Sequence, residues 1–124
     1  MARVLGIGGV FFKTADTKAL GDWYRRVLGF PINDWDGATF SHPRQGFTLW
    51  SPFKADTDYF APSQNAYMIN LIVDDLDGVL ERAKAEGVEP VGRQDETYGR
   101  FAWILDPAGA KVELWQPLED GGAS

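Results

Sequence analysis

The chain has 124 residues, no cysteine, 44% hydrophobic and 24% charged residues, and a formal net charge of −6 at pH 7. These values are typical of one folded domain, and they exclude disulfides, zinc–thiolate centres and a thiol nucleophile. The negative charge argues against nucleic acid as a partner, because that binding depends on basic surfaces. No apolar run approaches the roughly 20 residues that span a bilayer, and no signal-peptide pattern opens the chain. We therefore expect a cytoplasmic protein that does not bind membranes.

The first half predicts strands around one helix. Alternating or apolar runs at residues 8–14, 38–42 and 47–50 favour strands, with a weaker one near 31–33. An amphipathic helix lies between the first two, and the residues of its apolar stripe are Leu20, Trp23, Tyr24, Val27 and Leu28. Asp16 and Gly29 are placed to cap this helix. Strand alternation predicts that Val10 and Phe12 lie beneath it.

The second half predicts the same order of elements. Strands are expected at residues 67–73, 100–105 and 111–115, with a weaker one near 88–92. The helix between them has an apolar stripe made of Leu76, Val79, Leu80 and Ala83. Asp75 is placed to begin this helix and Gly87 to end it.

The two halves repeat one pattern. Asp16 is followed by a helix and Pro31, and Asp75 is followed at the same spacing by a helix and Pro90. Both halves close on Leu-Trp-x-Pro, at 49–52 and 114–117. A repeat of this length is a folding unit used twice. We predict a single domain over residues 1–124 with an α+β fold of two tandem βαβββ modules. The modules cover about residues 4–52 and 66–117, with a linker at about 53–65 and a tail at 118–124.

Each helix is expected to cover one face of its sheet and to leave the other face open. Alternation places the following residues on the open faces: Phe11, Lys13, Thr48, Trp50, Met68, Asn70, Glu113 and Trp115. Aromatic rings around a carboxylate and an amide are typical of small-molecule sites. The alternative is that these rings pack the two halves, or two subunits, against each other.

The doubled unit carries two motifs that resemble a known family. They are Asp-x₆-Trp-Tyr-x₃-Leu-Gly-Phe, from Asp16 to Phe30, and Asp-Pro-x-Gly-x₃-Glu-Leu, from Asp106 to Leu114. With the repeat, they resemble the vicinal oxygen chelate superfamily, which includes glyoxalase I, bleomycin-resistance proteins and extradiol dioxygenases. The resemblance covers about residues 4–117 and implies glyoxalase-like, partly open barrels, often completed in a homodimer.

The resemblance also implies four metal-binding positions, which correspond here to Gly9, Thr48, Met68 and Glu113. Only Glu113 is a usual ligand of a divalent metal, and such a metal needs about three nitrogen or oxygen ligands. We therefore expect no metal and no cofactor. The lone histidine, His42, occupies none of these positions, and its role stays open.

The function that these residues favour is metal-independent binding of a small, partly aromatic molecule, as in the bleomycin-resistance proteins. The expected ligand-binding residues are Phe11, Trp50, Met68, Asn70, Arg100, Glu113 and Trp115. The alternative is a lyase, isomerase or dioxygenase that uses a divalent metal, or Glu113 as a catalytic general base. Glu113 could instead pair with Lys13 or Arg100, or accept a hydrogen bond from Asn70. A third possibility is a scaffold whose grooves form an assembly interface. For residues 53–65, the linker, we expect either a lid over the groove or a plug between the modules.

Overall fold

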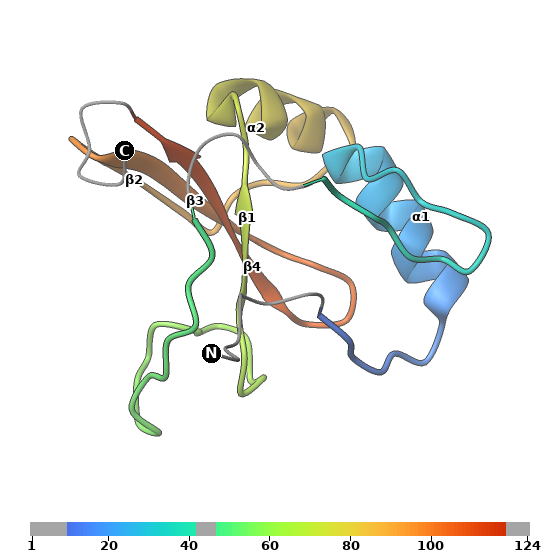
Figure 1. Cartoon of the computed structure of the whole chain (residues 1–124), viewed down its shortest axis with the longest axis horizontal. Coiled ribbons are helices and arrows are strands. Elements are labelled where there is room, and N and C mark those ends of the chain that lie inside the picture. Colours follow the sequence, from blue (N-terminus) through green and yellow to red (C-terminus); the bar gives the residue numbers. More distant parts are fainter. Residues whose placement is uncertain (1–9, 42–46, 119–124) are drawn as a thin grey trace, which may run out of the picture.

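The computed structural model describes residues 10–41 and 47–118. Its elements are α1 (Thr17–Leu28), β1 (Ile69–Ile72), α2 (Leu76–Ala85), β2 (Gly92–Glu96), β3 (Gly99–Leu105) and β4 (Lys111–Pro117). The strands form one sheet in the order β1-β4-β3-β2, with α2 across it and α1 beside α2 (Figure 1). The predicted α+β class is confirmed. Among the described residues, no helix has the length and apolar character needed to cross a membrane.

The second half forms the predicted βαβββ unit. Strand β1 pairs in parallel with β4, and β3 pairs antiparallel with both β4 and β2. Strand β2 begins where the predicted strand at 88–92 ends. Val88 is used in the hydrophobic core instead, and Pro90 has no N–H to give to a strand ladder. The pairing of Glu96 with Gly99 then fixes β2 against β3 through a short turn.

The described part of the first half differs from the prediction. Residues 10–14, 38–41 and 47–50 are not in strands, although Ile32 and Ala38 form an isolated bridge. Val10 and Phe12 are 57% and 45% exposed, so their predicted place beneath the helix is wrong. The reason is that α1 buries its apolar stripe against the second half. An alternating sequence also needs a hydrogen-bonded neighbour to become a strand, and sequence pattern alone does not supply one.

Local signals predicted the helix ends correctly. The side chains of Asp16 and Asp75 each accept a hydrogen bond from the backbone N–H three residues later, at 2.9 and 3.2 Å. Gly29 follows α1 with φ 73°, in the left-handed conformation that glycine adopts without strain. Gly87, with φ 82°, follows the end of α2 in the same region. These caps satisfy backbone groups that the helices leave unpaired.

Both helices contribute to one hydrophobic core on the same side of the sheet. Its buried members are Leu20, Tyr24, Val27, Leu76, Ala83, Ala102, Ile104, Val112 and Leu114. Arg82 of α2 adds a polar link, because its guanidinium donates to the carbonyl oxygens of Arg25 and Arg26 at 3.3 and 3.2 Å. Both carbonyls lie in the last turn of α1. That of Arg25 also accepts from the Gly29 N–H at 3.0 Å, so Arg82 adds a donor from α2 to the end of this helix.

A buried hydrogen bond joins α1 to the turn between β3 and β4. The Tyr24 hydroxyl donates to Asp106 Oδ2 at 2.7 Å, and both residues are 7% exposed. Asp106 Oδ1 accepts from the backbone N–H groups of Ala108 and Ala110 at 2.8 and 2.9 Å. The carboxylate therefore stabilises the turn and fixes the helix to it.

We expect Tyr24→Phe to lower the free energy of unfolding by about 1–3 kcal/mol, because a buried carboxylate oxygen loses its donor. Urea unfolding followed by circular dichroism measures this change. Tyr98→Phe is the matched control, since Tyr98 is 49% exposed, and it should leave stability nearly unchanged. A Tyr24→Phe variant as stable as the unsubstituted protein would contradict the role of this bond.

Stability should also fall in alkali through Tyr24. Burial and the hydrogen bond to Asp106 raise the pKa of Tyr24 above its ordinary value of 10.0. Above that pH the unfolded chain loses this proton while the folded chain keeps it. The contribution of Tyr24 is therefore fully present below about pH 10 and is lost progressively as the pH rises above it. The stability difference between the unsubstituted protein and Tyr24→Phe should therefore shrink between about pH 9 and about pH 11. A constant difference across this range would refute the linkage.

Candidate functional site

The sheet face opposite the helices combines polar atoms with aromatic rings. Asn70 lies opposite Glu113 across β1 and β4. Trp103 lies opposite Glu113, and Phe101 opposite Trp115, across β3 and β4. Because side chains alternate along a strand, these residues share one face. The structure thus brings Asn70, Glu113 and Trp115 together as strand alternation predicts.

The carboxylate of Glu113 is the polar centre of this face, and it is only 9% exposed. Its Oε1 accepts hydrogen bonds from the Tyr59 hydroxyl and from Trp103 Nε1, the latter at 3.0 Å. Its Oε2 accepts from Asn70 Nδ2 at 2.7 Å. Burying a carboxylate is costly unless donors replace water. Here two side chains of the sheet and one of the linker do so.

Tyr59 reaches Glu113 from the linker. Its ring stacks on Phe53 with centroids 5.5 Å apart and meets Trp103 edge-on at 6.0 Å. Lys111 Nζ donates to the Tyr59 carbonyl oxygen at 2.6 Å and lies 5.2 Å from the ring centroid. Burial and the hydrogen bond to Glu113 raise the pKa of Tyr59, so its phenol keeps the proton that it donates. The linker is therefore anchored on the polar centre of the face.

Trp115 forms the aromatic part of the face. Its ring is 6% exposed, lies parallel to Phe101 with centroids 6.3 Å apart, and meets Phe47 at 5.2 Å. Its buried Nε1–H has no hydrogen-bond partner in the described part of the chain. A Cβ on Gly99 would lie 2.7 Å from this nitrogen, so glycine keeps the space beside it open. An unpartnered buried donor is rare, and a ligand acceptor would satisfy it.

The other predicted site residues lie elsewhere. Phe11 and Trp50 are 95% and 80% exposed, and Met68 is half-buried just before β1. Arg100 lies opposite Gln116, on the helix side of β3, and its Nη1 is 3.7 Å from Asp77 Oδ2. The structure therefore does not bring Arg100 to Glu113. Of the partners considered for this carboxylate, Asn70 is the one that contacts it.

The sequence reasoning missed Tyr59, Trp103 and Phe101 as members of this site. Phe101 and Trp103 were detectable, because they share strand parity within the predicted strand at 100–105. For Tyr59 the signal was an aromatic residue in a polar linker, which does not say where the ring goes. Only the folded chain places it against Glu113, 54 residues away.

The residues at the family's metal positions do not fit a divalent metal. Of these positions, Gly9 lies outside the described residues, Thr48 is exposed, and Glu113 is already bonded to protein donors. The lone histidine, His42, which holds none of these positions, also lies outside the described residues. Within residues 10–41 and 47–118, no three histidine, cysteine or acidic side chains group so as to hold an ion. A threonine, a methionine and one carboxylate are not the nitrogen and oxygen set that such metals need.

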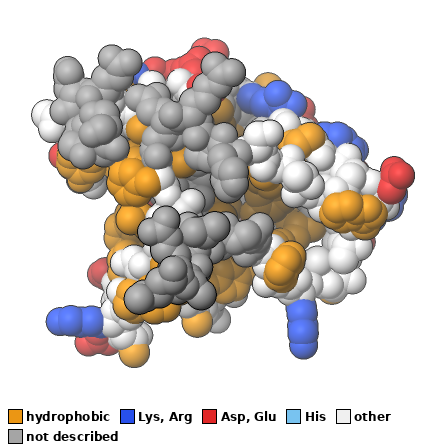
Figure 2. All heavy atoms as spheres, viewed as in Figure 1, with side chains coloured by type: hydrophobic (Ala, Val, Ile, Leu, Met, Phe, Trp, Pro, Cys, Tyr) orange, Lys and Arg blue, Asp and Glu red, His pale blue; other side chains and the backbone are white. Residues whose placement is uncertain are grey.

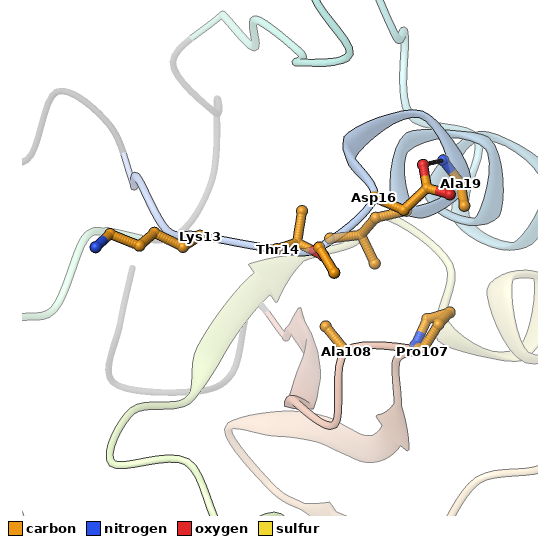
Figure 3. Close-up of a pocket in the computed structure, with 8 residues that line it drawn as sticks. Lys13, Thr14, Asp16, Ala19, Pro107 and Ala108 are labelled. Carbon is orange, nitrogen blue, oxygen red and sulfur yellow. Dashed lines mark hydrogen bonds between the residues drawn. The ribbon is translucent and has the colours of Figure 1, made fainter.

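A separate cleft of about 430 Å³ lies at the start of α1 and is lined by residues of that helix start and by Pro107 and Ala108. In Figure 3, the Asp16 side chain turns back to the Ala19 N–H, and Lys13 extends away from Pro107 and Ala108. The carboxylate that faces this cleft therefore serves as a helix cap. None of the residues that line this cleft is a buried carboxylate with several side-chain donors, as Glu113 is.

Comparison with protein families gives one domain match. The model of the glyoxalase-like domain matches residues 9–115, which is nearly the whole chain. No curated protein matches the sequence.

Solved structures share the fold. TnmS3 of Streptomyces sp. CB03234, an antibiotic binding protein, is 25% identical with a TM-score of 0.53, over 84% of this chain and 88% of that one. TioX of Micromonospora sp. ML1 is 20% identical with a TM-score of 0.52, over 85% and 90% of the two chains. A protein from the mobile metagenome of V. Pseudocholerae is 18% identical with a TM-score of 0.57, over 92% and 98%. These structures share the fold, and the domain match over residues 9–115 shows that the chain belongs to the glyoxalase-like family, within the vicinal oxygen chelate superfamily.

Proposed function

We propose that this protein binds a small, partly aromatic molecule on the open face of its sheet, without a metal. The observation that carries the proposal is the hydrogen bonding of Glu113. Tyr59, Asn70 and Trp103 stabilise the carboxylate with uncharged donors, where a metalloenzyme of this superfamily would use the equivalent position for its ion. Glu113 is thereby a polar anchor in an aromatic setting, as is common in ligand sites.

The surroundings of Trp115 support the same function. Phe101 and Phe47 border its ring, and its Nε1–H is buried without a partner among the described residues. Aromatic walls bind planar molecules by area and stacking, and a few polar atoms fix their orientation. Glu113 and Trp115 are two residues apart on one strand, so their side chains are spaced by about 7 Å along the face. A molecule of two fused or linked rings spans that distance.

The similarity to TnmS3 adds support. That protein is an antibiotic binding protein, and it is 25% identical to this chain over most of both lengths. A binding protein of the same fold fits a site that holds a ligand and does not transform it. We therefore favour sequestration of the bound molecule.

The enzymatic alternative requires Glu113 to take a proton from a substrate. Three of the about four acceptor positions of this carboxylate are already filled by protein donors, an arrangement that suits an anchored acceptor better than a group that must take up a proton. We rank this alternative below binding. It predicts turnover that Glu113→Gln abolishes, whereas sequestration predicts tight binding and no product.

We further propose a cytoplasmic homodimer. Phe11, Leu49 and Trp50 are 95%, 67% and 80% exposed, and Figure 2 shows hydrophobic side chains exposed at several places on one face of the molecule. Soluble proteins rarely leave large apolar patches uncovered. A second copy of the chain would cover them, as in the dimers that the family resemblance implies.

The binding proposal is tested with a panel of aromatic antibiotics and simple aryl compounds, by thermal stabilisation and then calorimetry, in buffer with EDTA. At least one compound should bind, and Trp115→Leu and Glu113→Gln should each weaken it about tenfold or more. Trp35→Leu is the matched control, since Trp35 is 75% exposed, and it should bind normally. Binding that needs an added metal, or a bound compound that is converted to product, would overturn the proposal.

The dimer is tested by sedimentation equilibrium, since one chain has a mass of 13.8 kDa. We expect twice this mass for the unsubstituted protein, because its exposed rings are buried between two copies. The double substitution Phe11→Ser and Trp50→Ser should give the single-chain mass, and Trp35→Ser should remain dimeric. A monomer at every concentration of the unsubstituted protein would exclude the dimer.

A further inference from the structure

The phenol of Tyr59 is held as a bound ligand would be. Phe53 stacks on its ring at an interplanar angle of 16°, and Trp103 meets it at 90°. Lys111 Nζ lies over the ring, and Glu113 accepts the hydrogen bond of its hydroxyl. A flat ring, an edge contact, a cation and an acceptor are together a complete set of contacts for a hydroxyaryl group.

The sheet part of this subsite does not depend on Tyr59. Trp103 and Glu113 are paired in register across β3 and β4, and Lys111 belongs to β4. Without the Tyr59 hydroxyl, Glu113 still accepts from Asn70 and Trp103. Removing the phenol therefore leaves an aromatic pocket with a carboxylate that lacks one donor.

Tyr59 itself is held more loosely than the residues beneath it. It lies in residues 53–65, which contain turns and no helix or strand, and it is 36% exposed. Within the described residues, hydrogen bonds from Lys111 to the Tyr59 carbonyl and from Ser63 to the Gly109 carbonyl also join this segment to the β3–β4 end of the sheet. Both bonds are exposed, and the strand pairing of the sheet uses no residue of this segment. The segment can for these reasons leave while the sheet stays folded.

We infer that Tyr59 is an internal plug, and that the molecule bound by this protein carries an aryl hydroxyl group that replaces the Tyr59 phenol on Glu113. This inference rests on the proposed binding function and specifies its ligand class. The phenol of Tyr59 leaves the subsite, and the hydroxyaryl group of the ligand takes its place with the same kinds of contact. An aromatic molecule without the hydroxyl would leave the buried carboxylate short of a donor, so the site discriminates against it.

The test uses 4-methylphenol, which is the tyrosine side chain without its backbone, and toluene, which lacks the hydroxyl. Calorimetry or NMR titration measures both with the full chain and with Tyr59→Ala. We expect 4-methylphenol to bind Tyr59→Ala at least about tenfold more tightly than it binds the unsubstituted protein, and about tenfold more tightly than toluene binds the variant. Trp35→Ala, which removes an aromatic ring that is 75% exposed, should behave as the unsubstituted protein does.

A second variant keeps the test valid if Tyr59→Ala does not fold. Tyr59→Phe keeps the ring and removes the competing hydroxyl, so 4-methylphenol should bind it more tightly than it binds the unsubstituted protein. An affinity of Tyr59→Phe equal to or below that of the unsubstituted protein would overturn the inference, with folding checked by circular dichroism.

The outcomes separate this inference from the proposed function. If toluene binds Tyr59→Ala as well as 4-methylphenol does, the hydroxyl preference is wrong, while aromatic binding on this face stands. If folded Tyr59→Ala gains no affinity for 4-methylphenol but panel compounds bind, the plug is wrong and the binding function stands. If no aryl compound binds any variant, both are wrong.

Discussion

The carboxylate of Asp106 connects the two halves of the chain, and the geometry of the site follows from it. One oxygen accepts the Tyr24 hydroxyl of α1, and the other accepts two backbone N–H groups of the turn between β3 and β4. That turn sets the register of the hairpin, which places Trp103 opposite Glu113. A one-residue slip would move every side chain of β4 to the other face. The buried carboxylate that binds α1 thus also belongs to the turn that sets which groups meet on the open side.

Glu113 shows how a buried acid is retained without a cation. Its fold position is one that metalloenzymes of the superfamily use for an ion, yet here Tyr59, Asn70 and Trp103 compensate for the lost water. Three uncharged donors stabilise a carboxylate by directed hydrogen bonds, and each donor fixes the orientation of its own ring or amide in return. The result is a polar centre between aromatic rings, held on the sheet itself by Asn70 and Trp103. Such a centre suits recognition of a shape with one polar group, which is the basis of the function that we propose.

The parts of the fold that were predictable are those that depend on neighbours in sequence. Asp16, Gly29 and Asp75 cap the helices as predicted, because capping involves residues within one turn. The strands at 100–105 and 111–115 were also found, since their alternation is matched by partners in an adjacent hairpin. The first-half strands were not, because an alternating run becomes a strand only beside a partner, and α1 packs on the second half instead. Tyr59 could not be placed, since its contact with Glu113 depends on the path of a whole linker.

The Leu-Trp-x-Pro motif is exposed in the first half and buried in the second, and this difference shows which half forms the candidate site. Trp50 and Trp115 hold equivalent places in Leu-Trp-x-Pro, yet Trp50 is 80% exposed and Trp115 is 6% exposed. Trp115 lies on β4, which has β1 on one side and β3 on the other, so its ring is enclosed by neighbours. Residues 47–50 are in no strand and leave their rings at the surface.

The second half thus supplies the sheet and its polar centre. The first half supplies α1, which packs beside α2 and bonds to the turn between β3 and β4. Phe47 and the linker residue Tyr59 reach the open face of the sheet. The second half therefore builds the floor of one site, and the first half and the linker provide its cover.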